Sequence, residues 1–555
     1  MLRRIVICSA LLVLAAGAAQ AAESFEPHRA YEAQVIPAAH FPNFLESPVR
    51  NLVLARYEAD SGRWQVVPFQ IDEVTPSGSY FGAPRPNLKP QDELVFMVRD
   101  LGDPAPAGSW PGEWGTPTDR YELQAVDPNA PGAARYIYLF RLPGEFTYQG
   151  EDLVSADRAQ DRIVSRYYTM GFHPNNGLPV DLAVTAQNGG DGLDLLDRLK
   201  IHLLATVNVF GQPVDIPINE ENSIQKAPPD SAAVNPLYLD GPVRVVRDFL
   251  VQFKLDLGPS VGVLPLPGIY TVRMHFFPYS MMVSLPGVDL SPLQSFGGSL
   301  KQIRLSFDYS PHAMGMTFQN PQNSVKIDGV PDAVVPTISP GQLNWMMVTG
   351  TPGTVLNLTL IPKIGTQQVL YYYDNLHSGG TALDGTEDTG DMVSIGDSGF
   401  LVSGTITSGK LDFLSYTFFL PPGQTGTDAA AFLQNIQHPL QVQFRYQPNT
   451  TSAADKGAAR SPDGWRLRVF PNPLSLHGTG PLHLQISLRR TLKVQPVLVD
   501  LLGRRTALSA PLRLGPGSHV LSFVLPRAKT LAAGVYWLVL ENGETRLAKR
   551  ILLLP

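Results

Sequence analysis

The sequence contains a single cysteine, Cys8, in 555 residues. Cys8 lies in an N-terminal segment with a basic start, a short apolar stretch and the small-x-small triplet Ala19–Ala21, which together are typical of a signal peptide at residues 1–21. The mature chain is therefore expected to begin at Ala22 and to contain no cysteine. This excludes disulfides, thiolate metal sites and cysteine nucleophiles, so packed cores must supply the stability.

Long apolar runs are also missing beyond the signal peptide. The remaining runs are short and interrupted by proline or glycine, so no transmembrane segment is expected after signal cleavage. With 50 prolines and 49 glycines the chain has little room for helices, and a helix is expected only in stretches such as 428–437. Short apolar and alternating runs elsewhere predict a mostly β protein.

Strand-like runs and turn signals divide the mature chain into parts. Several expected strands in the middle of the chain reach about ten residues, which suits a large antiparallel sandwich of two broad sheets. A run of small polar residues near Thr450 is typical of a linker. The predicted parts are an N-terminal β domain (22–150), a large antiparallel β-sandwich body (151–447), a linker (448–463) and a small immunoglobulin-like β-sandwich (464–555).

Charge is distributed unevenly between these parts. From Pro462 onward, 13 Lys and Arg face 4 Asp and Glu, a net charge of +9. Since the whole chain carries −6, residues 1–461 carry −15. An acidic body argues against binding of nucleic acid. It is compatible with a cation site or with an ordinary solvated acidic surface.

Recognisable catalytic motifs are absent from the sequence. It contains no His-Glu-x-x-His, no Gly-x-Gly-x-x-Gly that opens a helix and no Gly-x-Ser-x-Gly. This removes the common zinc-protease, dinucleotide and hydrolase signatures. Glycan-active enzymes often have no short motif, so that class stays open.

The strongest candidate for a site is the segment 371–397. Three tyrosines and an aspartate lead into a loop with five carboxylates, and a loop of this length is usually functional or mobile. Tyr373, Asp374 and His377 are the candidates for acid–base catalysis. Oxygen-rich loops can bind Ca²⁺, and a solvated acidic loop is the alternative. The candidate metal ligands are the acidic residues of the loop: Asp384, Glu387, Asp388 and Asp391.

Two tryptophans in a loop rich in proline and glycine are candidates for ligand binding. Trp110 and Trp114 would offer flat faces to sugar rings if those faces are exposed. Packing against the core is the alternative for large aromatic side chains.

The last ninety or so residues carry four motifs in a defined order: 470–473 (Phe-Pro-Asn-Pro), 500–504 (Asp-Leu-Leu-Gly-Arg), 534–538 (Gly-Val-Tyr-Trp-Leu) and 549–553 (Lys-Arg-Ile-Leu-Leu). This arrangement resembles the C-terminal sorting domain of type IX secretion cargo. The resemblance implies passage through the periplasm of a Gram-negative bacterium, the outer-membrane type IX machinery as partner, and delivery to the cell surface or medium. An ordinary immunoglobulin-like domain is the alternative. The implied motif residues are Pro471, Asn472, Pro473, Gly503, Gly534, Tyr536 and Lys549.

Two further segments, 68–73 and 91–96, resemble segments of uncharacterised secreted bacterial proteins, and that resemblance implies no activity. The sequence therefore favours an exported binding protein, with polysaccharide as one candidate ligand. The alternatives are a carbohydrate-active lyase or hydrolase with its site near 371–397, and a structural surface protein. None of these requires a cofactor, and Ca²⁺ is the one candidate.

Overall fold

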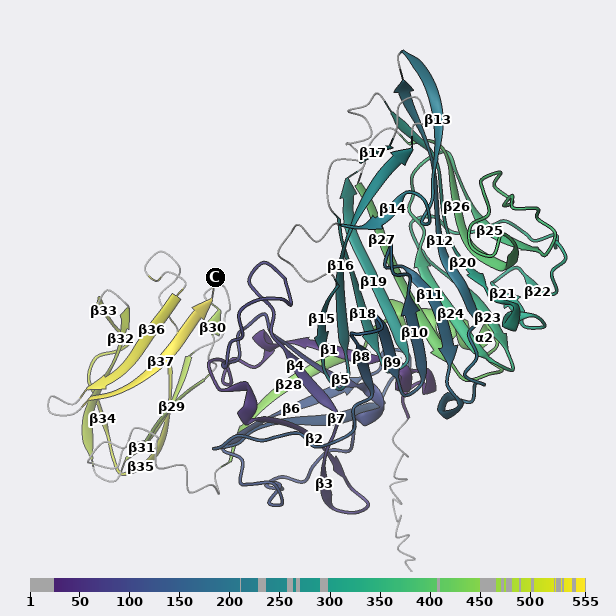
Figure 1. Ribbon diagram of the computed structural model, residues 1–555. Helices are drawn as coiled ribbons and strands as arrows, with labels where there is room; N and C mark the ends of the chain where they lie inside the picture. The colour runs from purple at the N-terminus through teal and green to yellow at the C-terminus, as the bar shows by residue number, and fades with distance from the viewer. Residues whose placement is uncertain are drawn as a thin grey trace, which may run out of the picture. The chain divides into compact units, whose positions relative to one another are not determined.

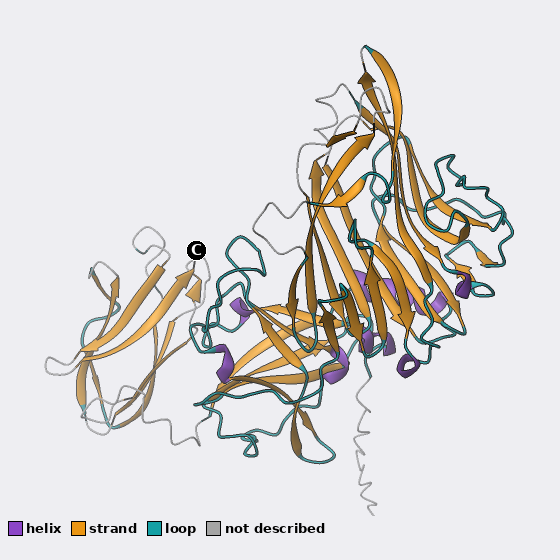
Figure 2. Ribbon diagram, viewed as in Figure 1, coloured by secondary structure: helices purple, strands orange, loops and turns teal. Residues whose placement is uncertain are grey.

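The computed structural model divides the chain into two compact units, residues 1–448 and 449–555, and each is described by itself. Strands dominate both units, which confirms the predicted mostly β class (Figures 1 and 2). No helix in the described part of the chain is long and apolar enough to cross a membrane. The predicted signal peptide lies outside the described residues, which are 24–449 without 210, 228–235, 257–262, 266–269, 290–297 and 407–409, followed by 466–470, 474–475, 482–488, 491–500, 504–523, 525, 531, 534–541 and 546–554.

The N-terminal part of the first unit holds two antiparallel sheets, with strand orders β28-β6-β7-β2-β3 and β1-β5-β4. Apolar side chains from both sheets share one core. β28 comes from the far end of the unit and pairs with β6 along its whole length, so the body is inserted between strands of one sheet. The strands are β1 (Ala33–Pro37), β2 (Leu52–Glu58), β3 (Arg63–Val66), β4 (Phe69–Asp72), β5 (Glu93–Met97), β6 (Asp119–Val126), β7 (Ala134–Arg141) and β28 (Gln441–Pro448).

The body of the first unit is built on a narrow and a wide antiparallel sheet. The narrow sheet has five strands in the order β13-β12-β20-β26-β25. The wide sheet has eleven, in the order β14-β16-β18-β19-β27-β24-β23-β21-β22, with β15 and β17 also paired to β16. Their apolar faces pack together, as expected for a sandwich. A four-stranded sheet, β11-β10-β9-β8, adds to the same core.

The strands of the body have the following bounds. Those of the narrow sheet are β12 (Leu196–Val209), β13 (Gln212–Ile218), β20 (Ser299–Tyr309), β25 (Gln367–Asn375) and β26 (Ser394–Ile406). Those of the wide sheet are β14 (Ile224–Lys226), β15 (Leu237–Asp240), β16 (Val245–Asp256), β17 (Val263–Pro265), β18 (Tyr270–Phe277), β19 (Ser280–Asp289), β21 (Thr317–Gln319), β22 (Ser324–Lys326), β23 (Leu343–Gly350), β24 (Gly353–Leu360) and β27 (Lys410–Leu420). The small sheet comprises β8 (Val154–Asp157), β9 (Arg162–Ser165), β10 (Tyr168–Phe172) and β11 (Pro179–Val184).

The helix α2 (Gly426–Gln437) forms where the sequence predicts one. It begins at a capping box, in which Thr425 and Asp428 each accept the backbone N–H of the other. Its buried face places Phe432 against Phe418 of the wide sheet, with ring centroids 4.7 Å apart. The helix therefore covers the outer face of that sheet.

A buried polar network joins the N-terminal part to the body. Arg244 Nε donates to Asp72 at 2.8 Å, and Gln70 Oε1 accepts the backbone N–H groups of Val243 and Arg244 at 2.9 and 2.7 Å. Burial raises the pKa of Asp72 above its usual value, although the charge of Arg244 opposes the rise. Gln70 and Asp72 lie in one of the two segments that resemble uncharacterised secreted proteins, and their role here is to fasten two sheets together.

The second unit is a small sandwich of two sheets, with strand orders β29-β31-β35 and β30-β37-β36-β32-β33, and β34 paired to β32. One apolar core lies between the two sheets. Its strands are β29 (Arg466–Phe470), β30 (Leu474–Ser475), β31 (Leu482–Leu488), β32 (Leu492–Asp500), β33 (Arg505–Ala507), β34 (Leu512–Leu514), β35 (Gly517–Phe523), β36 (Gly534–Glu541) and β37 (Arg546–Leu554).

The predicted sorting residues are only partly described. Gly534 and Tyr536 lie in β36, and Tyr536 is part of the core. Lys549 is exposed on β37. Outside the described residues are Pro471, Asn472, Pro473 and Gly503.

Candidate functional site

The narrow sheet separates two different environments. Successive side chains of a strand point to opposite faces of its sheet. On β20, Ile303, Leu305 and Phe307 therefore face the wide sheet, whereas Arg304 and Asp308 face the loop 376–393. The first face borders a cavity and the second carries a buried cluster of charges.

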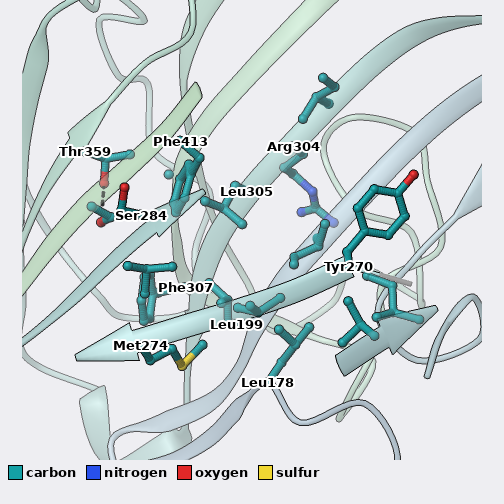
Figure 3. Close-up of a pocket in the computed structure, with 18 of the residues that line it drawn as sticks. Leu178, Leu199, Tyr270, Met274, Ser284, Arg304, Leu305, Phe307, Thr359 and Phe413 are labelled. Atoms are coloured by element: carbon teal, nitrogen blue, oxygen red, sulfur yellow. Dashed lines mark hydrogen bonds between the residues drawn. The ribbon is translucent and has the colours of Figure 1, made fainter. Parts of the chain in front are cut away.

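The cavity has a volume of about 890 Å³ and lies between the narrow and wide sheets. Figure 3 shows Leu199, Leu305 and Phe307 on its wall together with Met274 and Phe413. Ligand sites in proteins typically measure about 300–1,000 Å³ and have mostly apolar walls. Since well-packed interiors have few voids larger than a water molecule, a space of this size is a candidate binding site.

Two hydrogen-bonded pairs of neutral polar side chains lie on the wall that β24 and β27 form. Thr417 Oγ1 donates to Asn357 Oδ1 at 2.8 Å, and the hydroxyls of Thr359 and Ser415 lie 2.9 Å apart. The two pairs occupy neighbouring positions of the same strand ladder. We call these four residues the polar ladder. All four line the cavity.

The opposite face of the narrow sheet holds two buried cations. Lys200 Nζ lies 2.6 Å from Asp308 and 2.5 Å from Asp388. Arg304 lies 3.1 Å from Asp384 and 3.0 Å from Asp397. None of these side chains is more than 1% exposed. Two of the carboxylates come from the loop 376–393, so the ion pairs fix that loop to the sheet.

Four carboxyls around two cations cannot all be ionised at low cost, and the pKa shifts reflect this. Burial raises the pKa of Asp308 well above its usual value, against the opposing charge of Lys200. Burial also raises the pKa of Asp388, but Lys200 lowers it further, so the net pKa is low. Burial lowers the pKa of Lys200, whereas Asp308, Asp397 and Asp388 raise it and prevail. The cluster therefore stabilises the charged form of Lys200 and disfavours the ionised form of Asp308.

A histidine extends this cluster. His202 Nδ1 lies 2.8 Å from the Thr386 hydroxyl, and Nε2 lies 3.2 Å from that of Thr389. Burial would raise the pKa of Glu220, but hydrogen bonds and charge from His202, with a hydrogen bond from Thr389, hold it at about 2. These contacts add further attachments between the loop and the sheet.

The three predicted catalytic residues take up separate positions. The Tyr373 hydroxyl accepts from Asn375 at 2.6 Å. Asp374 is buried and accepts three backbone N–H groups, from Asp328, Gly329 and Gly396, at 2.7–3.1 Å. His377 is exposed. In the described part of the chain no hydrogen bond joins any two of Tyr373, Asp374 and His377, and the contacts of Asp374 are those of a carboxylate that holds loops together.

The four predicted metal ligands also separate. Asp384 and Asp388 contact Arg304 and Lys200, as above, and Glu387 is exposed. Asp391 lies with Asp197 and Asp308 in a group whose carboxylate oxygens are all within 4.8 Å of one another. Such a group could hold a cation, although Ca²⁺ takes six to eight oxygen ligands. A cation bound there would also compete with Lys200 for Asp308.

The two predicted binding tryptophans are half-buried and pack against the N-terminal sheet. The rings of Trp110 and Trp114 lie 6.1 and 5.4 Å from that of Phe140. The Arg120 guanidinium lies 4.6 Å from the Trp110 ring centre. These contacts anchor the loop and occupy part of the aromatic surface.

Comparison with known proteins finds similarity among solved structures. No family model matches the chain, and no curated protein matches it. Among solved structures it is similar to an alpha-mannosidase from Enterococcus faecalis V583, with 12% identity, a TM-score of 0.38, and coverage of 89% of this chain and 55% of that one. It is also similar to a protein in glycosyl hydrolase family 38 from the same species, with 10% identity, a TM-score of 0.37, and coverage of 88% and 55%.

The chain spans about half the length of these two structures. At such TM-scores neither likeness supports an inference about this chain.

Sequence reasoning missed the cavity, the polar ladder and the two buried cations. A signal for the cations is present in the strand patterns. In 199–203 and 303–308, apolar residues alternate with charged or polar ones. Charges on one face of two long strands in a body with broad sheets point to pairing between those strands or with a covering loop. The cavity leaves no such trace, because its walls have the composition of an ordinary core.

Proposed function

We propose that the chain is a binding protein whose cavity, between the narrow and wide sheets, holds an elongated apolar ligand. The observation that carries this proposal is a space of about 890 Å³ with largely apolar walls inside a β-sandwich. Burial of an apolar molecule there would remove its surface from water at about 25 cal/mol per Å². It would also supply contacts that the wall side chains lack while the space is empty.

The chemistry of the wall supports binding rather than turnover. A catalytic site needs titratable groups held near the reacting atoms with separated pKa values. The polar ladder is neutral, and the guanidinium of Arg304 contacts Asp384 and Asp397 on the other face of the sheet. At one edge of the cavity Arg273 makes two hydrogen bonds, of 2.8 and 2.6 Å, to Asp248. The charged groups near the cavity are thus used in pairs.

A glycan ligand, one candidate from the sequence, has weaker support. Sugar recognition would use open aromatic faces, and Trp110 and Trp114 are half-buried against Phe140 and Arg120. The cavity wall is too apolar for a chain of hydroxyl groups, each of which would lose its hydrogen bonds to water.

Binding is tested with N-phenyl-1-naphthylamine, an apolar dye that fluoresces when it leaves water. The mature chain is expected to bind it, and Leu305→Trp, which places bulk in the cavity, is expected to weaken binding at least tenfold. Leu193→Trp is the matched control, because Leu193 is 47% exposed and lies outside the cavity. No dye binding by the wild type, or equal binding by both variants, would refute the proposal.

We further propose that the protein is exported and that its second unit is the sorting domain that delivers it to the cell surface or medium. The support is the order of the four motifs and the signal-like N-terminus, together with a two-sheet fold that suits such a domain. Deletion of residues 470–555 is expected to leave the first unit folded in the periplasm while surface delivery is lost. Continued surface delivery of the shortened chain would contradict this role.

A further inference from the structure

The polar ladder, Asn357, Thr359, Ser415 and Thr417, contains hydrogen-bond donors that have no acceptor among the described residues. Asn357 is 4% exposed, and its Oδ1 already accepts from Thr417. Its Nδ2 carries two more hydrogens, and in the described part of the chain neither has a partner. Buried amide donors are paired in the great majority of cases. An unpartnered amide on a cavity wall therefore points to a partner supplied by the ligand.

The second rung of the ladder provides another donor beside the first. When two hydroxyls form one hydrogen bond, the accepting hydroxyl keeps its own hydrogen. In the Thr359–Ser415 pair that hydrogen has no acceptor in the described part of the chain, so it can turn toward the cavity, which both residues line. Because Asn357 and Thr359 lie two positions apart on β24, they project from the same face of the strand. The donors therefore form one patch.

We infer that the ligand is an apolar molecule that carries a neutral carbonyl group, such as an ester, ketone or amide, within its length, and that the polar ladder binds this group. This inference rests on the proposed function and defines its ligand class. A carbonyl oxygen has two lone pairs and no hydrogen, so it matches a patch of donors. A carboxylate fits less well, because no ion pair joins a described cation to the ladder and an unpaired buried charge is costly.

The test is competition for the dye by a series of oxostearates in which a ketone is moved along the chain, with stearate as the parent. All members share the same carboxylate and nearly the same length, so differences between them report the ketone alone. One position is expected to displace the dye at a concentration about 3- to 10-fold lower than stearate, which is the range of one added hydrogen bond.

The double variant Asn357→Leu with Thr417→Val is expected to abolish this preference and to change dye affinity less than about twofold. Replacing both partners of a hydrogen bond by apolar groups of similar shape avoids leaving one unpaired. The double variant Thr359→Val with Ser415→Ala is a second, independent removal of a donor, because it takes away both hydroxyls of the other pair. Thr349→Val is the matched control, because Thr349 forms a similar hydroxyl pair with Thr354, 2.7 Å away, but does not line the cavity.

The outcomes separate this inference from the proposed function. Dye binding without a preferred ketone position, a preference that survives in the ladder variants, or a preference that is also lost in Thr349→Val overturns the carbonyl inference and leaves the apolar cavity in place. Absence of dye binding in the wild type overturns both. A preference lost in the ladder variants and kept in Thr349→Val supports both.

Discussion

Replacing Lys200 by methionine tests whether the buried cluster holds the loop 376–393 on the narrow sheet. The substitution keeps much of the side-chain volume and removes the ammonium that lies 2.6 Å from Asp308 and 2.5 Å from Asp388. Asp388 then remains buried without its cation. Removal of one partner from a buried ion pair typically costs about 3–5 kcal/mol. We expect Lys200→Met to lower the stability of the first unit by an amount in that range at pH 7.

The stability loss caused by Lys200→Met is expected to depend on pH. In the wild type Lys200 lowers the pKa of Asp388, so that carboxylate adds stability that is present above its unfolded pKa and is lost as the pH falls. In the variant, burial without Lys200 raises the pKa of Asp388, so the variant gains protons on folding and loses stability as the pH rises. The difference between the two proteins is therefore expected to shrink from pH 7 toward pH 4.

The loss is measured by hydrogen exchange in increasing urea, followed in peptides from β12, β20 and the loop. This method reports local stability, which is needed because a chain of two units does not unfold in a single step. Lys301→Met is the matched control. Lys301 also lies on β20 and contacts Asp215, but both side chains are 46% exposed, so its loss should cost less than about 1 kcal/mol. Equal losses for the two variants, or a loss at Lys200 that is independent of pH, would refute the reasoning.

Two further predictions follow from other contacts. Burial raises the pKa of Asp161, but Arg247 and Lys226 hold it at about 2. Asp161→Asn should therefore reduce the free energy of unfolding by about 2–4 kcal/mol at pH 7 and by almost nothing near pH 2. Urea titrations at both pH values measure this difference. A similar cost at both pH values would contradict this. Chelation by EDTA is expected to leave the melting midpoint unchanged, because Asp308 already contacts Lys200 and Asp197 already contacts Arg198. A fall of several degrees would instead indicate a bound ion.

The features that the sequence predicts are those encoded locally. Alternating residues such as 482–488 identify strands, and the capping residues Thr425 and Asp428 accompany the one predicted helix. The mostly β class follows from such patterns together with the many prolines and glycines. None of them depends on which strand lies beside which.

The features that the sequence does not predict depend on pairing between distant segments. Lys200 and Asp388 are 188 residues apart, and β28 pairs with a strand more than 300 residues earlier. The acidic loop illustrates the difficulty, because its composition alone suggested metal ligands or a solvated surface. Only the register of β12 beside β20 shows that two buried cations lie beneath Asp384 and Asp388. A cavity is harder still, since a hollow core and a full one share the same residue types.

A last prediction distinguishes an open ligand space from an ordinary core by whether one substitution raises or lowers the stability of the protein. Val283 borders the cavity on β19, whereas Val355 on β24 is fully buried and does not border it. Val283→Ile adds a methylene to empty space and should stabilise the unliganded protein by about 0.8 kcal/mol. Val355→Ile adds the same group to filled space and should destabilise it by about 1–3 kcal/mol.

The same pair of variants connects stability with binding. The added methylene of Val283→Ile occupies room that a ligand would use, so dye affinity is expected to fall as stability rises, while Val355→Ile leaves dye affinity unchanged. Urea unfolding and dye titration measure the two quantities on the same samples. Destabilisation by Val283→Ile would mean that the side chains already fill this space, and the case for a bound apolar ligand would fail. A gain in stability together with a loss of affinity is the result that only an open binding space explains.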